Sequence, residues 1–264
     1  MENLRRYGNA PFNVVVVHGG PGACGGMAPV ARELCINRGI LEPLQTAISI
    51  KGQVKELKTV LENHGSTPVI LIGYSWGAWL VFILSSQYPS IAKKLILVGS
   101  GPFEDKYAVN IEKTRLSRLD EKDRSEVKSL IEILKNSAVD NKNEVMSRLG
   151  ELISRADSYC PLPDDSEPLE CNFQIYQNVW QEADELRHSG KLLELGKKIR
   201  CPVVAIHGDY DPHPFEGVKS PLSRIIKDFR FILLKNCGHK PWIERDAKDR
   251  FYEILKEELG YSNL

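Results

Sequence analysis

The residues best suited to chemistry lie in a short turn bracketed by glycines. Ser75 stands between Gly73 and Gly77 in the sequence GYSWG, after the apolar run Val69–Ile72 and before a longer apolar run. A serine on a tight strand-to-helix turn is held out above a sheet, and the crowding of that turn requires very small residues two positions before and after it. Both glycines meet this requirement, so the pattern predicts a nucleophilic serine.

A nucleophilic serine needs hydrogen-bond donors for the oxyanion that develops on its substrate. The first turn of the expected helix leaves the amide of Trp76 without an intrahelical partner, which makes it one candidate donor. The second is expected in His18–Gly22 (HGGPG), directly after the apolar run Phe12–Val17. Glycines let the backbone approach a substrate closely, so the amide of Gly20, or of Gly19, is expected to complete the oxyanion hole. A tight turn without a ligand is the competing interpretation.

Two later segments offer a base and a group to orient it. Serine is a weak nucleophile at neutral pH unless a base takes its proton and a third group fixes that base. Asp211 follows the apolar run Val203–Ile206, and His239 follows Phe231–Leu234. Ligands bind at the carboxyl ends of the strands in open α/β sheets. We therefore expect Asp211 as the acid and His239 as the base, in the chain order serine, acid, histidine.

Neighbouring residues compete with this assignment. Asp209 is a second candidate for the acid, although its position directly after the strand favours a turn or capping role. His213 is expected to be too close in sequence to turn back onto Asp211. His18 is expected to support its own glycine loop by hydrogen bonding. Two further histidines are expected to be solvated: His64 and His188.

The length and composition indicate a globular enzyme. A chain of 264 residues is long enough for one large domain, or a domain with an insert, and for a substantial core. Its 35 basic and 35 acidic side chains give a net charge of 0, so neither nucleic acid nor a membrane surface is an expected partner. Neither a metal cluster nor a dinucleotide motif is evident, and we expect no cofactor.

The cysteines and the N-terminus indicate a reducing location. Six cysteines show no paired spacing and are expected to be reduced thiols. Cys24 and Cys237 flank the expected site, but neither occupies the glycine-bracketed turn, so we treat both as packing residues. No secretory signal is visible, which predicts a cytoplasmic protein. The uncharged segment Ser66–Ala92 is long enough to span a bilayer, but its polar interruptions favour a buried strand, turn and helix.

Strands and helices alternate along most of the chain. Continuous apolar runs, typical of a parallel sheet covered on both faces, occur at Phe12–Val17, Val69–Ile72, Leu95–Val98, Val203–Ile206 and Phe231–Leu234. Between residues 103 and 200 helical periodicity replaces the strand signal, which predicts a helical insert. Residues 104–199 hold 20 acidic and 15 basic side chains, a net charge of −5. We expect an α/β core domain at 1–103 and 200–264 and a helical cap domain at 104–199.

The acidity of the insert is concentrated in one segment. Five acidic residues follow one another there without an intervening Lys or Arg: Asp157, Asp164, Asp165, Glu167 and Glu170. A solvated, proline-rich loop is the favoured interpretation. A surface that binds a cationic group is the alternative.

Together these motifs resemble the α/β-hydrolase superfamily, and HGGPG with Ser75-Trp76-Gly77 is similar to its proline-iminopeptidase-like branch. The resemblance implies an α/β-hydrolase fold, a mostly parallel, doubly wound sheet with a helical cap insert. Only 17 residues precede His18, so the N-terminal edge of the sheet is expected to be shortened. The Asp-Gln-Arg-Gly type of segment usual in that branch is missing from Gly39–Ser49. An iminopeptidase would also need a cap carboxylate for the amino group of its substrate.

Our main hypothesis is a serine hydrolase that cleaves an ester or amide bond of a small substrate through an acyl-enzyme. The alternatives are an N-terminal proline aminopeptidase and a catalytically silent ligand-binding protein on the same fold. Acyl transfer or a lyase reaction would use the same residues.

Overall fold

A seven-stranded sheet forms the centre of the molecule. The computed structural model describes residues 3–136, 138–163 and 170–261. The strands lie in the order β1-β4-β2-β5-β6-β8-β9, and all pairs are parallel except the edge strand β1, which is antiparallel to β4. The strand bounds are β1 Leu4–Tyr7, β2 Phe12–Val17, β4 Gly39–Pro43, β5 Val69–Tyr74, β6 Ala92–Val98, β8 Val203–Gly208 and β9 Phe229–Leu234.

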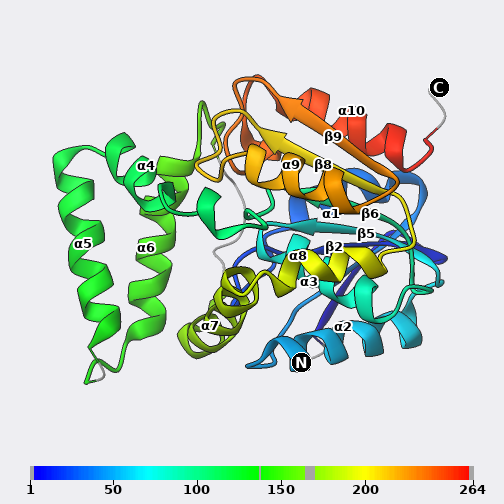
Figure 1. The fold of residues 1–264 in the computed structure, drawn as a ribbon, viewed down its shortest axis with the longest axis horizontal. Coiled ribbons are helices and arrows are strands. Elements are labelled where there is room, and N and C mark those ends of the chain that lie inside the picture. The colour runs from blue at the N-terminus through cyan, green and yellow to red at the C-terminus, as the bar shows by residue number, and fades with distance from the viewer. Residues whose placement is uncertain (1–2, 137, 164–169, 262–264) are drawn as a thin grey trace.

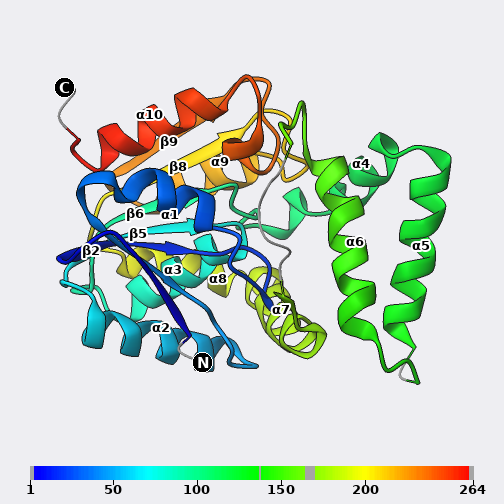
Figure 2. The same ribbon diagram turned by 180° about the vertical axis from the view of Figure 1, so that it is seen from behind.

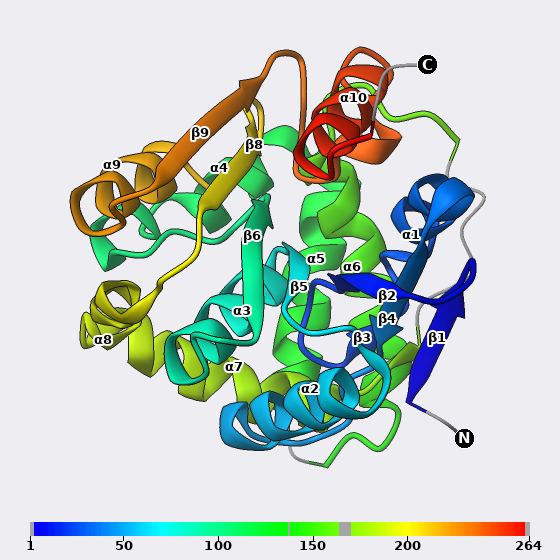
Figure 3. The ribbon, with the colours of Figure 1, turned by 90° about the vertical axis from the view of Figure 1, so that its right-hand side faces the viewer.

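Helices cover both faces of this sheet (Figures 1 and 3). Alternate residues of each strand point to opposite faces, so the apolar runs feed two separate cores. Val15, Val17 and Leu71 contribute to one core, and Val14 and Val16 to the other. The helices over the first face are α2 Ile50–His64, α3 Trp76–Gln87 and α9 Glu216–Ile225. Those over the second face are α1 Ala28–Leu34 and α10 Lys248–Glu258.

Between β6 and β8 the chain inserts a group of helices, and the first three of them extend away from the sheet (Figure 2). These three helices share a small hydrophobic cluster that includes Val127 and Leu152. The helices of the insert are α4 Ile111–Arg118, α5 Glu121–Lys135, α6 Lys142–Asp157, α7 Phe173–His188 and α8 Lys191–Glu194. The side chains of Val179 and Leu192 in the last two pack into the core over the first face of the sheet. The division into a core of 1–103 and 200–264 and a cap of 104–199 stays a prediction.

Short elements complete the fold. The two-residue strands β3 Ala23–Cys24 and β7 Glu170–Cys171 pair antiparallel, which ties the segment after the glycine loop to the insert. Among the described residues, short 3-10 helices occur at Cys35–Asn37, Asp105–Tyr107, Leu195–Lys198 and Pro241–Ile243.

The expected fold class, an α/β-hydrolase fold with a mostly parallel sheet, is confirmed. All five strands expected from apolar runs are present, but β1, β4 and the β3–β7 pair were not expected. Ser66–Ala92 folds as the end of a loop, β5, α3 and the turn that leads into β6, so it contains the buried strand, turn and helix that the polar interruptions indicated. In the described part of the chain, no helix is long and apolar enough to cross a membrane.

Candidate active site

The turn between β5 and α3 places Ser75 in a strained backbone conformation. Its φ is 52° and its ψ is −115°, a region that L-residues rarely adopt. A Cβ atom on Gly73 would lie 2.3 Å from the carbonyl oxygen of Gly77, and one on Gly77 would lie 2.3 Å from that of Val17. Larger residues at either position would clash with backbone, so the two glycines permit the turn that presents the serine.

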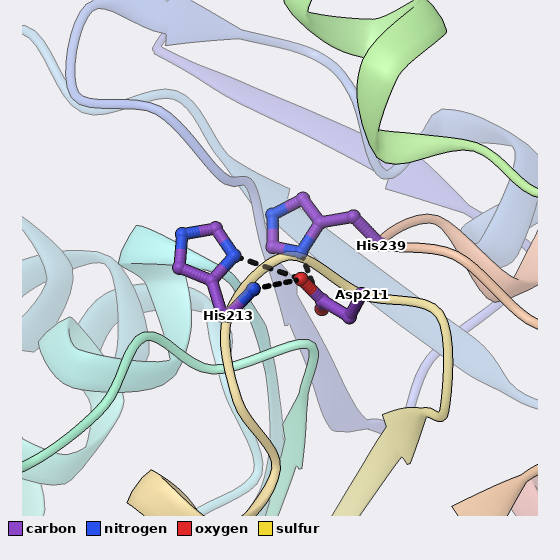
Figure 4. Close-up of side chains that lie close together, drawn as sticks. All are labelled: Asp211, His213 and His239. Carbon is purple, nitrogen blue, oxygen red and sulfur yellow. Dashed lines mark hydrogen bonds and ion pairs between the residues drawn. The ribbon is translucent and has the colours of Figure 1, made fainter. Parts of the chain in front are cut away.

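The structure brings Ser75, Asp211 and His239 into one hydrogen-bonded line. His239 Nε2 lies 3.1 Å from Ser75 Oγ, and His239 Nδ1 lies 2.7 Å from Asp211 Oδ2. With the Nδ1 proton directed at the carboxylate, Nε2 is left to accept from the serine hydroxyl. Asp211 and His239 are both buried, and Figure 4 shows the carboxylate and the imidazole side by side.

His213 also binds the carboxylate, and the expectation that it is too close in sequence to do so is wrong. Its backbone N–H and its Nδ1 lie 2.9 Å and 2.8 Å from Asp211 Oδ1. A third histidine, His207, lies with Nε2 3.3 Å from Asp211 Oδ2 and 2.8 Å from the carbonyl oxygen of His213. Three imidazoles therefore surround one buried carboxylate, and sequence analysis foresaw only that of His239.

These surroundings set the charge of the cluster. Burial would raise the pKa of Asp211, but the neighbouring His239, His207 and His213 hold it well below its usual range. Burial lowers the pKa of His213 to about 4 and that of His207 below its usual value. At pH 7 Asp211 is therefore a carboxylate, and His207 and His213 are neutral.

Residue types that bind metal ions also meet here. The ligand atoms of Asp211, His213 and His239 lie within 4.8 Å of one another. Both carboxylate oxygens and both Nδ1 atoms are already engaged in the hydrogen bonds just described. Hydrogen bonding within the cluster therefore accounts for its geometry.

The loop that carries His239 is held by the insert. The backbone N–H of His239 donates to the carbonyl oxygen of Asp157, at the end of α6, over 2.8 Å. The side chain of Asp157 pairs with Arg115 of α4, through contacts of 2.8 Å and 2.7 Å. Sequence analysis grouped Asp157 with an acidic surface, but this carboxylate is buried and neutralised. Glu170 is exposed, and Asp164, Asp165 and Glu167 lie outside the described residues.

A second buried carboxylate holds the same loop. Glu244 has no exposed surface, and it accepts three backbone N–H groups: those of Gly238 at 3.0 Å, Tyr159 at 2.9 Å and Cys160 at 2.8 Å. Gly238 precedes His239, whereas the other two residues follow α6. Glu244 therefore joins the histidine loop to the insert, a role that sequence analysis missed because no local pattern marks it.

The glycine loop runs beside Ser75. A Cβ atom on Gly19 would lie 2.7 Å from the ring of Tyr74 and 3.0 Å from Ser75 Cβ, so a glycine lets the backbone pass close to both residues. The imidazole of His18 is buried, with Nδ1 2.9 Å from the carbonyl oxygen of Gly19. Its Nε2 accepts the backbone N–H of Gln45 over 3.4 Å. His18 thus supports the loop, as expected.

The remaining candidates lie outside the triad. Asp209 Oδ1 accepts the backbone N–H of Cys237 over 3.3 Å, which is the structural role expected for it. Burial raises the pKa of the Cys237 thiol, and it raises the pKa of Cys24 to about 11, so neither is a thiolate at pH 7. Two histidines are exposed, as expected: His64 and His188. All six cysteines are free thiols.

Comparison with known proteins identifies the family to which the chain belongs. Residues 21–246 match the family model described as the alpha/beta hydrolase fold, which covers most of the chain. The chain therefore belongs to the α/β-hydrolase family, and the class of activity that this family supports is that of a hydrolase. No curated protein sequence matches the chain.

Several solved structures share the fold. A thermophilic esterase from Thermogutta terrifontis is 20% identical, with a TM-score of 0.64 over 97% of this chain and 92% of that one. Proline iminopeptidase from Mycobacterium smegmatis is 14% identical, with a TM-score of 0.64 over 97% and 93%. A monoacylglycerol lipase from Paleococcus ferrophilus is 16% identical, with a TM-score of 0.60 over 97% of both chains. These low identities show the shared fold, and the proline-iminopeptidase branch is one neighbour among several.

Proposed function

We propose that the chain is a serine hydrolase that cleaves an ester or amide bond of a small substrate through an acyl-enzyme. The observation that carries the proposal is the continuous line from Ser75 Oγ through His239 to the carboxylate of Asp211, with contacts of 3.1 Å and 2.7 Å. A serine on a strained turn, an imidazole nitrogen beside it and a buried carboxylate behind that imidazole are the parts that nucleophilic catalysis requires.

The first step forms the acyl-enzyme. Ser75 Oγ bonds to the carbonyl carbon while its proton passes to His239 Nε2. The imidazolium is stabilised by Asp211, and it then returns the proton to the departing alcohol or amine as the bond to that group breaks. In the second step a water molecule bonds to the acyl carbon and gives a proton to His239 Nε2. The imidazolium then gives this proton to Ser75 Oγ as the bond between Oγ and the acyl carbon breaks, which releases the acid and restores the serine.

The oxyanion hole is assigned to the amides of Trp76 and Gly20. Trp76 is the first residue of α3, so its N–H has no intrahelical acceptor. The carbonyl of Gly19 is directed at the buried ring of His18. In a trans peptide the N–H points opposite to the C=O, so this contact turns the N–H of Gly20 away from His18.

An N-terminal proline aminopeptidase stays the alternative proposal. Recognition of a free amino group would need a carboxylate without a cationic partner. Among the described residues of the insert the only buried carboxylate is that of Asp157, which is already paired with Arg115. The small-molecule substrate and the cytoplasmic location stay predictions.

Labelling with a fluorophosphonate probe tests the proposal. The probe reacts with serines that have a working base, so intact-mass analysis should show one adduct, and peptide mapping should place it on Ser75. The Ser75→Ala variant should take up no label and should lose esterase activity by about 10⁴-fold or more, with an unchanged circular dichroism spectrum. A folded wild-type protein that takes up no label would instead support the silent binding protein.

A further inference from the structure

His213 is fixed against the catalytic acid from three sides. Its backbone N–H and its Nδ1–H both donate to Asp211 Oδ1, and its carbonyl oxygen lies 2.8 Å from Nε2 of the buried His207. The side chain of His213 is 11% exposed. The ring is therefore held in one orientation before any substrate binds.

The contact with Asp211 also fixes which nitrogen of His213 carries the proton. A carboxylate can only accept, so Nδ1 of His213 is the protonated nitrogen. Because burial lowers the pKa of His213 to about 4, the ring is neutral at pH 7 and Nε2 keeps its lone pair. Nε2 of His213 is therefore a hydrogen-bond acceptor with a set direction.

This acceptor lies beside the base of the proposed triad. The ring centroids of His213 and His239 are 4.7 Å apart, with the ring planes inclined by 33°. Figure 4 shows both rings meeting the carboxylate through Nδ1, with their Nε2 atoms on the far sides. Nε2 of His239 lies 3.1 Å from the serine hydroxyl. Among the described residues, none donates a hydrogen bond to Nε2 of His213. This nitrogen is nevertheless not one of the fully buried polar atoms without a partner, so part of its surface is accessible.

We propose that His213 is a specificity-determining residue whose Nε2 accepts a hydrogen bond from the substrate. The proposal rests on the proposed hydrolase function and deepens it, because it assigns a chemical feature to the substrate. A good substrate carries a hydroxyl or an amide N–H a few bonds from the scissile carbonyl, and an analogue without that donor leaves the acceptor unpaired. One neutral hydrogen bond corresponds to about a 3- to 10-fold difference in kcat/KM.

Matched ester pairs measure this preference. On the alcohol side the pair is 2-hydroxyethyl butyrate and propyl butyrate, which differ by a hydroxyl in place of a methyl group. On the acyl side the pair is the p-nitrophenyl esters of N-acetylglycine and O-acetylglycolic acid, which differ by N–H in place of oxygen. The ratio of kcat/KM within each pair is compared between wild type and His213→Phe, so that intrinsic reactivity cancels.

The expected result is that the wild type prefers the donor-bearing ester of at least one pair by about 3- to 10-fold beyond the ratio shown by His213→Phe. The variant also loses the Nδ1 donor to Asp211, which lowers its rates with both members of a pair and leaves the ratio to report on Nε2. His213→Leu gives a second, smaller replacement in case the phenyl ring disturbs folding. His188→Phe, at an exposed position, is the matched control and should keep the wild-type ratios.

The outcomes separate the two proposals. Equal ratios in wild type, His213→Phe and His213→Leu for both pairs would overturn the role of His213, while hydrolysis that depends on Ser75 would leave the serine hydrolase intact. If the wild type hydrolyses none of the four esters and takes up no fluorophosphonate, the hydrolase proposal fails, and the role of His213 fails with it.

Discussion

Asp211 is the residue on which the polar contacts of the site converge. Its position was predictable, because the carboxyl ends of parallel strands meet at one edge of a sheet, and the same reasoning selected His239. The approach of His213 was not predictable. It depends on a turn in which the backbone and the side chain of His213 both reach back to the same carboxylate oxygen, and sequence spacing does not show such a turn.

Two aspartates at the end of β8 provide a matched test of the acid. Asp211→Asn is expected to lower kcat by about 10³- to 10⁴-fold, because the amide no longer holds the Nδ1 proton of His239. Asp209→Asn should change kcat less than about threefold, since Asp209 contacts only the loop at Cys237 and Lys235. Steady-state hydrolysis of a p-nitrophenyl ester at several pH values measures both. A larger loss in the Asp209 variant would reverse the assignment.

At the level of elements, apolar runs revealed the buried strands but not the short ones. β4 (Gly39–Pro43) is wholly buried, yet it contains a glutamate and ends in proline, so its pattern is not that of an apolar strand. Glu42 is accommodated there because it accepts the hydroxyl of Tyr7 at 2.7 Å and the amide of Met27 at 3.1 Å. Those partners come from distant segments, and only the folded structure identifies them.

Glu244 links two elements, and its replacement should affect both. In Glu244→Gln one carboxylate oxygen becomes an NH₂ group, which cannot accept a hydrogen bond. The NH₂ group would face either the backbone N–H groups of Tyr159 and Gly238 or the backbone N–H of Cys160. The substitution is therefore expected to lower the free energy of unfolding by about 1–3 kcal/mol. Ser75 should then react more slowly with fluorophosphonate, because Gly238 adjoins His239. Urea unfolding and the labelling rate measure the two effects.

The control for this change is Glu253→Gln on the outer face of α10. Glu253 is exposed and pairs with Arg250 at the surface, so its replacement should change stability by less than about 0.5 kcal/mol. If the Glu244 variant were as stable as this control and labelled as fast, the buried carboxylate would have no positioning role.

For the whole molecule, the alternation of strands and helices was enough to predict the class of fold and the edge of the sheet that carries the site. The attachment of the insert was not predictable. The contacts that fasten it join residues far apart in sequence, such as Asp157 to His239 and Asn172 to Gly22. Sequence analysis singled out His239, Gly22 and Asp157 for other reasons, but nothing in their type or spacing indicates these contacts with the insert.

Stability of the whole chain should fall steeply below about pH 6.5. Burial lowers the pKa of His18, His207 and His213, so the unfolded chain binds up to three more protons than the folded chain as the pH falls from 6.5 towards 4. The folded pKa values lie below the unfolded ones, so the free energy of unfolding decreases with falling pH, by up to about 4 kcal/mol per pH unit.

Urea unfolding between pH 7.5 and 5 measures this slope. His213→Phe removes one of the three groups and should reduce the slope by about a third. If the free energy of unfolding of the wild type were constant across this range, the prediction would be wrong, because burial would then not lower the pKa of these histidines.

The insert is attached to the two halves of the proposed active site separately. The pairing of Asn172 with Gly22 and of β7 with β3 reaches the glycine loop. Asp157 binds the histidine loop directly, and Glu244 of the core joins that loop to Tyr159 and Cys160 of the insert. In evolutionary terms, such an insert cannot be replaced as a unit without affecting both loops of the proposed site. A replacement acquired by recombination would have to restore an acceptor for the amide of His239 and a strand beside Ala23–Cys24 before the older chemistry worked again. Changes of substrate range in this lineage are therefore expected to arise by point substitution within the existing helices.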